Sequence, residues 1–471
     1  MSTCWQLLIG AVANLGTIAV GMSMGFSAVA LPAMQDPYHV PHVSEEQASW
    51  IASMISVGMP LGCLFIGPLL DRLGRRRTII LVNAPAVVGW FLIATVPSNE
   101  HWFFPQLYIG RFLAGVSVGL VSLPVIVYVS EVLDKNLRGF VITWGSLGVS
   151  TGILSVYILG SLIKDNWRVV AGICNVFPVL AIVMAWFLLP ESPVWLALKE
   201  RFQEAELSMR RIRGVPHTED LDDVLREELD AMIDNIAQNH DITFMEMLAQ
   251  LKRPEVYKPL AIFNSFFFFQ QFSGIYVIIL YSVIMVQEMG IQLDGYIITV
   301  LIGVCRVIMA VVTSYATGRF GRRILCNTSG IGMTLSLTAL ATYLSMVHDG
   351  TLQSSEGWFP ATMMLLAVLT ACLGFLSLPF AMIGEVFPPQ VRSNACAATT
   401  FVATTFAFLA VKLFPDMRRV MGYHNLFTFY AAVSAIGTLL MYVYIPETQG
   451  KTLEEVEQMF KKPDKFVEQK R

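Results

Sequence analysis

Two polar features of this chain lie inside long apolar stretches, where a polar side chain needs a partner. Gln270 and Gln271 follow a run of phenylalanines, and Arg306 interrupts the apolar stretch from 295 to 318. A guanidinium within an apolar span is costly and usually faces a cavity or a partner. An amide both donates and accepts hydrogen bonds, so it also needs partners there. These residue types indicate non-covalent contacts, made either with a bound solute or between helices.

Patterns for catalysis and metal binding are weak. The segment Gly115-Val-Ser-Val-Gly119 matches the nucleophile elbow of hydrolases, but no strand precedes it and no histidine–acid pair accompanies it. The cysteines are scattered singly, without the spacing of a metal site or a disulfide framework. We therefore expect no enzyme activity, no cofactor and no metal site. Small residues four apart, such as Gly115 and Gly119, instead favour close packing of helices.

The composition excludes a soluble globule. Hydrophobic residues make up 55% of the 471 residues, charged residues make up 14%, and the mean hydropathy is +0.60. Soluble proteins contain about 25% charged residues, and a globule of this length could not bury so much apolar surface. The net charge of −3 offers no basic field for nucleic acid. The chain is predicted to be a multi-pass protein of the lipid bilayer that binds no nucleic acid.

Twelve apolar stretches are each long enough to cross a bilayer, which takes about 20 residues in a helix. They do not alternate between apolar and polar residues, so helices are expected rather than a barrel. Lys and Arg gather in the loops on the side of the N-terminus, so we expect both termini in the cytosol. The predicted spans are residues 5–35, 47–70, 78–99, 112–130, 139–163, 169–190, 259–287, 295–318, 324–348, 357–384, 393–411 and 420–446.

Three charged landmarks of the first half of the chain recur in the second half at nearly one offset. Such an internal repeat indicates duplication of a structural unit. We therefore predict an all-α membrane protein of two six-helix halves. The recurring landmarks are Arg75-Arg76 and Arg322-Arg323, Glu131 with Arg138 and Glu385 with Arg392, and Pro190-Glu191 and Pro446-Glu447.

Two repeated halves with a charged linker fit a carrier that exposes a midplane site to each side in turn. We predict an N-terminal half at 1–190, a cytosolic helical linker at 191–256, a C-terminal half at 257–446 and a cytosolic tail at 447–471. Salt bridges of loop arginines with helix-end carboxylates would close the inner side. Alternatively, these charges only fix the topology. The predicted gate residues are Asp71, Arg72, Arg75, Arg76, Glu131, Arg138, Arg319, Arg322, Glu385 and Arg392.

These landmarks resemble the sugar porter family of the major facilitator superfamily, and the match runs from end to end. Within that family the sequence looks most like the insect facilitated trehalose transporter group. The resemblance implies the major facilitator fold and facilitated transport of a hexose or a trehalose-like disaccharide, which we expect at the plasma membrane. The motifs are Asp71-Arg72-Leu-Gly-Arg-Arg, Gly110-Arg111, Glu131 with Arg138-Gly139, Pro190-Glu-Ser-Pro-Val-Trp195, Gln270-Gln271-Phe-Ser-Gly274, Glu385 with Arg392, and Pro446-Glu-Thr-Gln-Gly-Lys451.

The resemblance also implies which residues bind the sugar. Gln270 and Gln271 match the two glutamines that hydrogen-bond sugar hydroxyls in the family. Other pocket positions depart from the family pattern, which puts glucose or trehalose as the substrate in question. These departures are Ser146 for a glutamine, Tyr276 and Arg306 for asparagines, Phe380 for a tryptophan, and Ala403-Thr404 for an asparagine–tryptophan pair.

The departures leave alternatives to a neutral-sugar carrier. Arg306 could line the central cavity and favour an anionic organic solute, or it could lock helices together through carbonyl hydrogen bonds. The missing pocket partners also allow a sensor that binds a solute without moving it. Proton-linked family members carry an Asp in the first span, where this chain has Ser23, so uniport is expected. Gly318 replaces the usual acid before Arg319, which predicts a looser inner closure. The sequence leaves the oligomeric state open.

Overall fold

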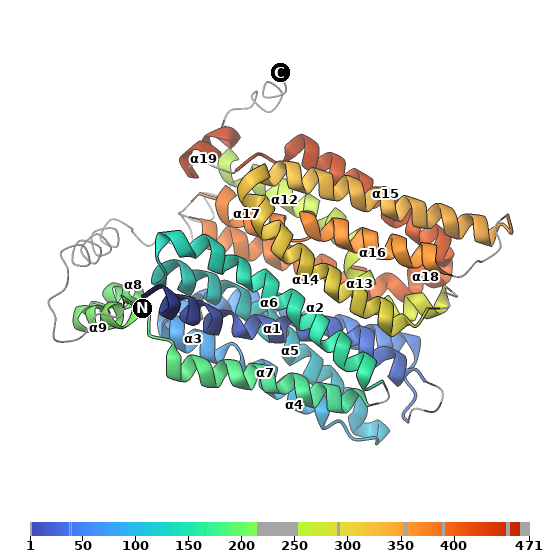
Figure 1. The fold of residues 1–471 in the computed structure, drawn as a ribbon, viewed down its shortest axis with the longest axis horizontal. Coiled ribbons are helices and arrows are strands. Elements are labelled where there is room, and N and C mark those ends of the chain that lie inside the picture. Colours follow the sequence, from blue (N-terminus) through green and yellow to red (C-terminus); the bar gives the residue numbers. More distant parts are fainter. Residues whose placement is uncertain are drawn as a thin grey trace.

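The computed structural model describes residues 2–36, 38, 40–164, 166–213, 253–289, 293–351, 357–388, 391–448 and 453–461. Every regular element among these residues is helical. Figure 1 shows a single elongated bundle in which the early helices pack along one side and the late helices along the other. The predicted duplication thus corresponds to two groups of helices that lie side by side.

The N-terminal half forms six membrane-crossing segments. The second begins at a capping box, in which the Ser44 hydroxyl accepts from the Gln47 N–H and the Gln47 side chain accepts from the Ser44 N–H. The third is divided in two, with Asn83 at the N-cap and a proline in the first turn of its second part. The helices are α1 (Ser2–Met34), α2 (Glu45–Leu73), α3 (Arg75–Leu81), α4 (Ala84–Ala94), α5 (Glu100–Val132), α6 (Lys135–Leu162) and α7 (Trp167–Leu188).

The C-terminal half contains two broken spans that the apolar pattern does not reveal. The seventh span breaks at Gly274, where φ is +80° and an added Cβ would lie 2.3 Å from the Tyr430 ring. The tenth span breaks between residues 373 and 378. The helices are α12 (Pro254–Phe272), α13 (Ile275–Glu288), α14 (Gly295–Phe320), α15 (Arg322–His348), α16 (Trp358–Leu373), α17 (Leu378–Val386) and α18 (Arg392–Tyr444).

The number of spans agrees with the prediction. Eleven helical segments of the described chain are long and apolar enough to cross a membrane. The last of them, α18, contains two helices joined at Gly422, whose φ of 68° and ψ of 165° are not helical. It therefore holds both the eleventh and the twelfth predicted spans. The prediction of an all-α protein with twelve spans is confirmed.

Glycines bring the helices of the N-terminal half into close contact. A Cβ added to Gly152 of α6 would lie 2.0 Å from the carbonyl oxygen of Ile18 in α1. A Cβ on Gly119 of α5 would lie 2.1 Å from the carbonyl oxygen of Met59 in α2. Ser117, the nucleophile of the apparent hydrolase motif, donates its hydroxyl to the carbonyl of Val82. This segment is a packing surface, as the small-residue spacing predicts.

Three short helices lie at one end of the bundle, which we call the inner face; the opposite end is the outer face (Figure 1). They are α8 (Pro193–Leu198), α9 (Phe202–Arg213) and α19 (Leu453–Lys461). The Trp5 indole of α1 donates to the carbonyl of Arg211 in α9, and Lys258 of α12 donates to the carbonyl of Phe460 in α19. Each half is thus braced by its own short helix. Residues 214–252 of the predicted linker lie outside the described chain.

Candidate solute site and gates

The two glutamines lie in the last turn of α12, at the centre of the span that α12 and α13 form together. Both face the protein interior, with 1% of Gln270 and 6% of Gln271 exposed. The Gln270 Nε2 donates to the carbonyls of Phe375 at 2.6 Å and Leu376 at 3.2 Å, in the break between α16 and α17. The one side-chain hydrogen bond of Gln271 within the described chain runs from its Nε2 to the Gln270 Oε1 at 3.4 Å. The Gln270 amide therefore links α12 to the tenth span, whereas the Gln271 amide makes no such link in the described chain.

Arg306 lies in the middle of α14 and is 8% exposed. Its Nη1 contacts the thiol of Cys372 at 3.8 Å, and its buried Nε has no hydrogen-bond partner in the described chain. Arg111 of α5, which is fully buried, differs because each of its three nitrogens has an oxygen acceptor. Arg111 thus links helices in the way that one alternative predicted for Arg306. The acceptors of Arg111 are the Ile51 carbonyl at 3.2 Å, the Ser23 carbonyl at 3.0 Å and the Ser27 hydroxyl at 2.6 Å.

The other three predicted pocket residues occupy different surroundings. Tyr276, in the first turn of α13, is half-buried and lies beside Ser56 of α2. The Phe380 ring of α17 lies 4.6 Å from that of Phe267, one turn before the glutamines. Ser146 is exposed on α6, and no hydrogen bond in the described chain links it to the glutamines. The structure thus places Tyr276 at the interface of the halves and Phe380 beside α12.

At the outer face, ion pairs join the two halves. Arg418 of α18 forms a salt bridge with Glu45 of α2 at 2.8 Å and with Glu288 of α13. Arg419 adds a 3.1 Å pair to Glu45. Since only 15% of the Arg418 side chain is exposed, water screens its pairs less than those of Arg419, whose side chain is 64% exposed. We call Arg418, Glu45 and Glu288 the outer latch.

Two further contacts cross the outer face. Lys164, beyond the end of α6, pairs with Asp294 at 2.5 Å, and this hydrogen-bonded ammonium holds the pKa of Asp294 below its usual range. The carboxylate therefore stays charged as the pH falls from 8 to 5, and the pair is lost only below its lowered pKa. Lys412 of α18 donates to the Ser49 hydroxyl at 2.7 Å and lies 4.4 Å above the Trp50 ring. Sequence patterns missed these contacts because their partners are far apart in the chain.

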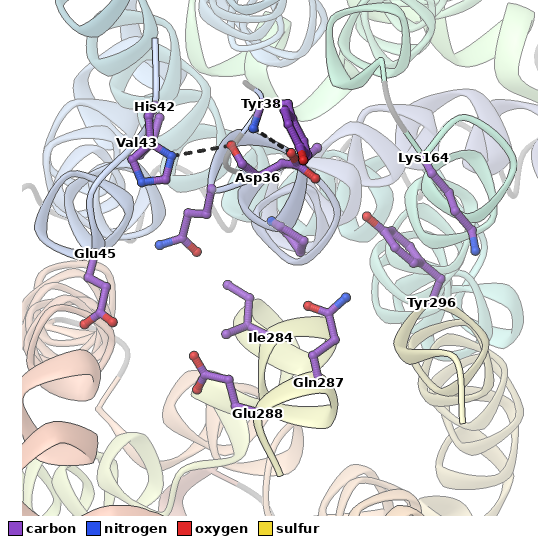
Figure 2. Close-up of a pocket in the computed structure, with 13 residues that line it drawn as sticks. Asp36, Tyr38, His42, Val43, Glu45, Lys164, Ile284, Gln287, Glu288 and Tyr296 are labelled. Carbon is purple, nitrogen blue, oxygen red and sulfur yellow. Dashed lines mark hydrogen bonds between the residues drawn. The ribbon is translucent and has the colours of Figure 1, made fainter. Parts of the chain in front are cut away.

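A hollow of about 850 Å³ lies beside the outer latch. Figure 2 shows Asp36 and Glu45 of the N-terminal half on one side of it, and Ile284, Gln287 and Glu288 of α13 on the other. Glu45 and Glu288 belong both to the latch and to the wall of the hollow. The hollow therefore marks the line along which the halves would separate if the outer face opened.

At the inner face, the predicted gate pair Arg75–Glu131 is a close two-pronged salt bridge. The Arg75 Nε lies 2.9 Å from one Glu131 oxygen, and its Nη2 lies 2.8 Å from the other. Glu131 also accepts a hydrogen bond from the Ser192 hydroxyl, beside α8. These three residues join α3, α5 and the start of the linker. The pair therefore lies within the N-terminal half in this structure.

Two carboxylates that close the sixth and twelfth spans cap helices at equivalent places in both halves. Glu191 accepts from the N–H groups of Arg75 at 2.8 Å and Arg76 at 2.9 Å. Glu447 accepts from those of Arg322 at 3.0 Å and Arg323 at 3.1 Å. A carboxylate satisfies the free N–H groups of a helix N-terminus and its partial positive charge. The sequence showed Glu191 and Glu447 only as repeated landmarks, without this role.

The remaining predicted gate residues are spread over the inner face. Asp71 and Arg72 are exposed at the end of α2. Arg138 donates its Nε to the carbonyl of Leu133 at 2.8 Å, and the exposed Arg319 contacts the Tyr315 hydroxyl at 3.2 Å. For two residues the structure places the helices but does not describe the side chains. They are Glu385 of α17 and Arg392 of α18.

A family model for "Sugar (and other) transporter" matches residues 9–460. The chain belongs to this family. The facilitated trehalose transporter Tret1 of Culex quinquefasciatus is 30% identical over 453 residues, which are 96% of this chain and 85% of that protein. Tret1 of Drosophila grimshawi is 32% identical over 455 residues, which are 96% of this chain and 47% of that protein. The chain thus spans about half the length of the Drosophila relatives.

Solved structures show the same fold. XylE, a proton:xylose symporter of the major facilitator superfamily, was solved with 6-bromo-6-deoxy-D-glucose and matches with a TM-score of 0.79 at 20% identity, over 98% of this chain and 100% of that one. Inward-open XylE from E. coli matches with a TM-score of 0.78 at 20% identity, over 96% of this chain and 99% of that one. The predicted family and the major facilitator fold are confirmed.

The outer latch predicts a specific effect of Arg418→Ala. Loss of this shared cation leaves two carboxylates facing each other, which should favour opening of the outer face by about 1 kcal/mol, or roughly fivefold. A Cys introduced at Ile284, in the wall of the hollow, should then react faster with an impermeant thiol reagent added outside cells. Arg419→Ala is the matched control and should have a smaller effect. Equal labelling rates in Arg418→Ala and the parent would contradict a latch.

Proposed function

We propose that this chain is a facilitative carrier that moves a sugar across a membrane by alternating access. The Gln271 amide carries the proposal, because it lies at the centre of a broken span with few hydrogen bonds of its own. An amide both donates to and accepts from hydroxyl groups, the groups that a sugar offers in quantity. The Tret1 relatives, described as facilitated trehalose transporters, support the same solute class.

Facilitated diffusion is favoured over proton coupling by the positions of the carboxylates. Among the described residues, every Asp and Glu lies outside the twelve predicted spans. A proton relay through the membrane would need a titratable group within a span. Ser23 lies in the first span, and its carbonyl accepts a hydrogen bond from Arg111. The span interiors therefore offer no carboxylate that could carry a proton through the described part of the bundle.

The inner charged residues are proposed to hold the inner face shut when the outer face is open. Arg75 is anchored to Glu131 in the N-terminal half, and Arg322 to Glu447 in the C-terminal half, so a small rotation of either half would move the charges of that half together. The excess of Lys and Arg in the loops of this face supports cytosolic termini. We propose the plasma membrane as the location, where such a carrier would take up solute from outside the cell.

Uptake by purified protein in liposomes tests the carrier. Labelled glucose and trehalose should each be supplied, and at least one should equilibrate across the membrane without exceeding the outside concentration. An imposed pH gradient should not change the final level, because no carboxylate within the described spans couples protons to flux. Uphill accumulation driven by the gradient would show a symporter. Binding without flux would instead show a sensor.

The two glutamines should respond differently to substitution. Gln271→Leu removes a ligand group and should lower kcat/KM for sugar by about tenfold, since an unpaired buried hydroxyl costs about 1–3 kcal/mol. Gln270→Leu removes two hydrogen bonds to the break of the tenth span and should lower the thermal unfolding midpoint of the purified protein. Measurement of both quantities for both variants separates the roles. An unchanged kcat/KM in Gln271→Leu would exclude a ligand role for that residue.

A further inference from the structure

We infer that the central site takes a sugar bearing a negative charge, such as a carboxylate or a phosphate, with Arg306 binding the anionic group. The inference rests on the proposed sugar carrier and narrows its substrate class. Three observations carry it: the unfilled hydrogen-bonding capacity of Arg306, the charge balance at the centre of the bundle, and the position of Arg306 relative to the glutamines and the two halves.

A comparison with Arg111 shows how few hydrogen bonds Arg306 makes. Both arginines lie within spans of the same protein, so both had to be removed from water. Arg111 meets three oxygen acceptors, whereas Arg306 meets one thiol, a weak acceptor, at 3.8 Å. Its Nε is buried without a partner in the described chain. A buried cation in this state is strongly destabilising unless something else pairs with it, and an anionic ligand would supply the missing acceptors.

The charge balance at the centre of the bundle is positive. Arg111 of the N-terminal half and Arg306 of the C-terminal half both lie within electrostatic reach of the Tyr276 hydroxyl. The described carboxylates lie outside the predicted spans, away from this point. An apolar surrounding increases the effect of each charge. A negatively charged solute would therefore be bound here more favourably than a neutral one of the same shape.

Arg306 and Gln270 contact one short segment of the tenth span. The thiol that Arg306 meets belongs to Cys372, and the carbonyls that Gln270 meets belong to Phe375 and Leu376. The anion-binding group and the neighbouring amide of Gln271 are thus held around the same break in the backbone. One ligand could present hydroxyls to Gln271 and its charged group to Arg306.

Arg306 also lies at the interface between the halves. One turn before it, an added Cβ on Gly303 would lie 3.0 Å from Leu154 of α6, in the other half. Tyr157, one turn further along α6, donates its hydroxyl to the carbonyl of Ile279 in α13 at 2.7 Å. A ligand bound by Arg306 would thus be exposed or enclosed as the halves move, as a transported solute must be.

The experiment compares anionic with neutral sugars in liposomes containing the purified protein. The probes are glucuronate, glucose 6-phosphate, glucose and trehalose, with uptake measured for the parent, Arg306→Asn, Arg306→Lys and Arg77→Asn. The parent should take up at least one anionic sugar with kcat/KM at least tenfold above that for glucose. Arg306→Asn should abolish this preference, and Arg306→Lys should retain part of it. Arg77→Asn removes an exposed charge outside the site and should keep the preference.

Uptake of the two anionic sugars and the thermal shift of the protein together test the anion site. Preference for glucuronate alone or glucose 6-phosphate alone identifies the anionic group. Equal rates for charged and neutral sugars in the parent, or an unchanged preference in Arg306→Asn, would overturn the inference and leave the neutral-sugar carrier standing. If no sugar crosses, the carrier proposal fails, and a thermal shift of the parent by glucuronate then tests the anion site alone. A shift that Arg306→Asn loses supports the site, and no shift in the parent overturns it.

Discussion

The apolar interior of a bilayer does not solvate charge, and the arrangement of this protein depends on that constraint. Within the described chain, the carboxylates lie outside the predicted spans, where several of them cap helices or pair with arginines. Arg111 is stable in the interior because three oxygens of neighbouring helices accept hydrogen bonds from its guanidinium. Arg306 differs from Arg111 because the described part of the fold does not supply an oxygen acceptor for its guanidinium. A ligand that supplies such acceptors would stabilise this buried charge.

The same constraint explains how two rigid halves are built and joined. Glu191 and Glu447 cap equivalent helices, so each half carries its inner charges as part of its own framework. Contacts between halves at the outer face instead include side-chain pairs such as Arg418–Glu45 and Lys164–Asp294. Since partly exposed pairs each contribute only about 0–1 kcal/mol, the halves can separate there without disturbing either framework. A carrier needs this contrast between strong contacts within a half and weak contacts between halves.

Sequence patterns predicted the spans and the duplication because both are local or periodic properties. They did not reveal the breaks at Gly274 and near Phe375, since an apolar run is equally continuous through a straight or a broken helix. They also could not pair Arg418 with Glu45, because nothing local connects residues so distant in the chain. The two glutamines appear equivalent in the sequence. The structure distinguishes them, because Gln270 donates to a carbonyl of the tenth span whereas Gln271, within the described residues, donates only to Gln270. This difference is the basis for proposing a structural role for Gln270 and a binding role for Gln271.

Alternating access requires the two halves to move relative to each other, and distances between spin labels measure that motion. One pair of labels belongs at Val40 and Val420, which are exposed at the outer face, and another at Arg77 and Phe320 at the inner face. In liposomes that take up sugar, we expect two populations, in which a longer outer distance accompanies a shorter inner one. A single fixed distance at both faces, in protein that transports at full rate, would contradict it.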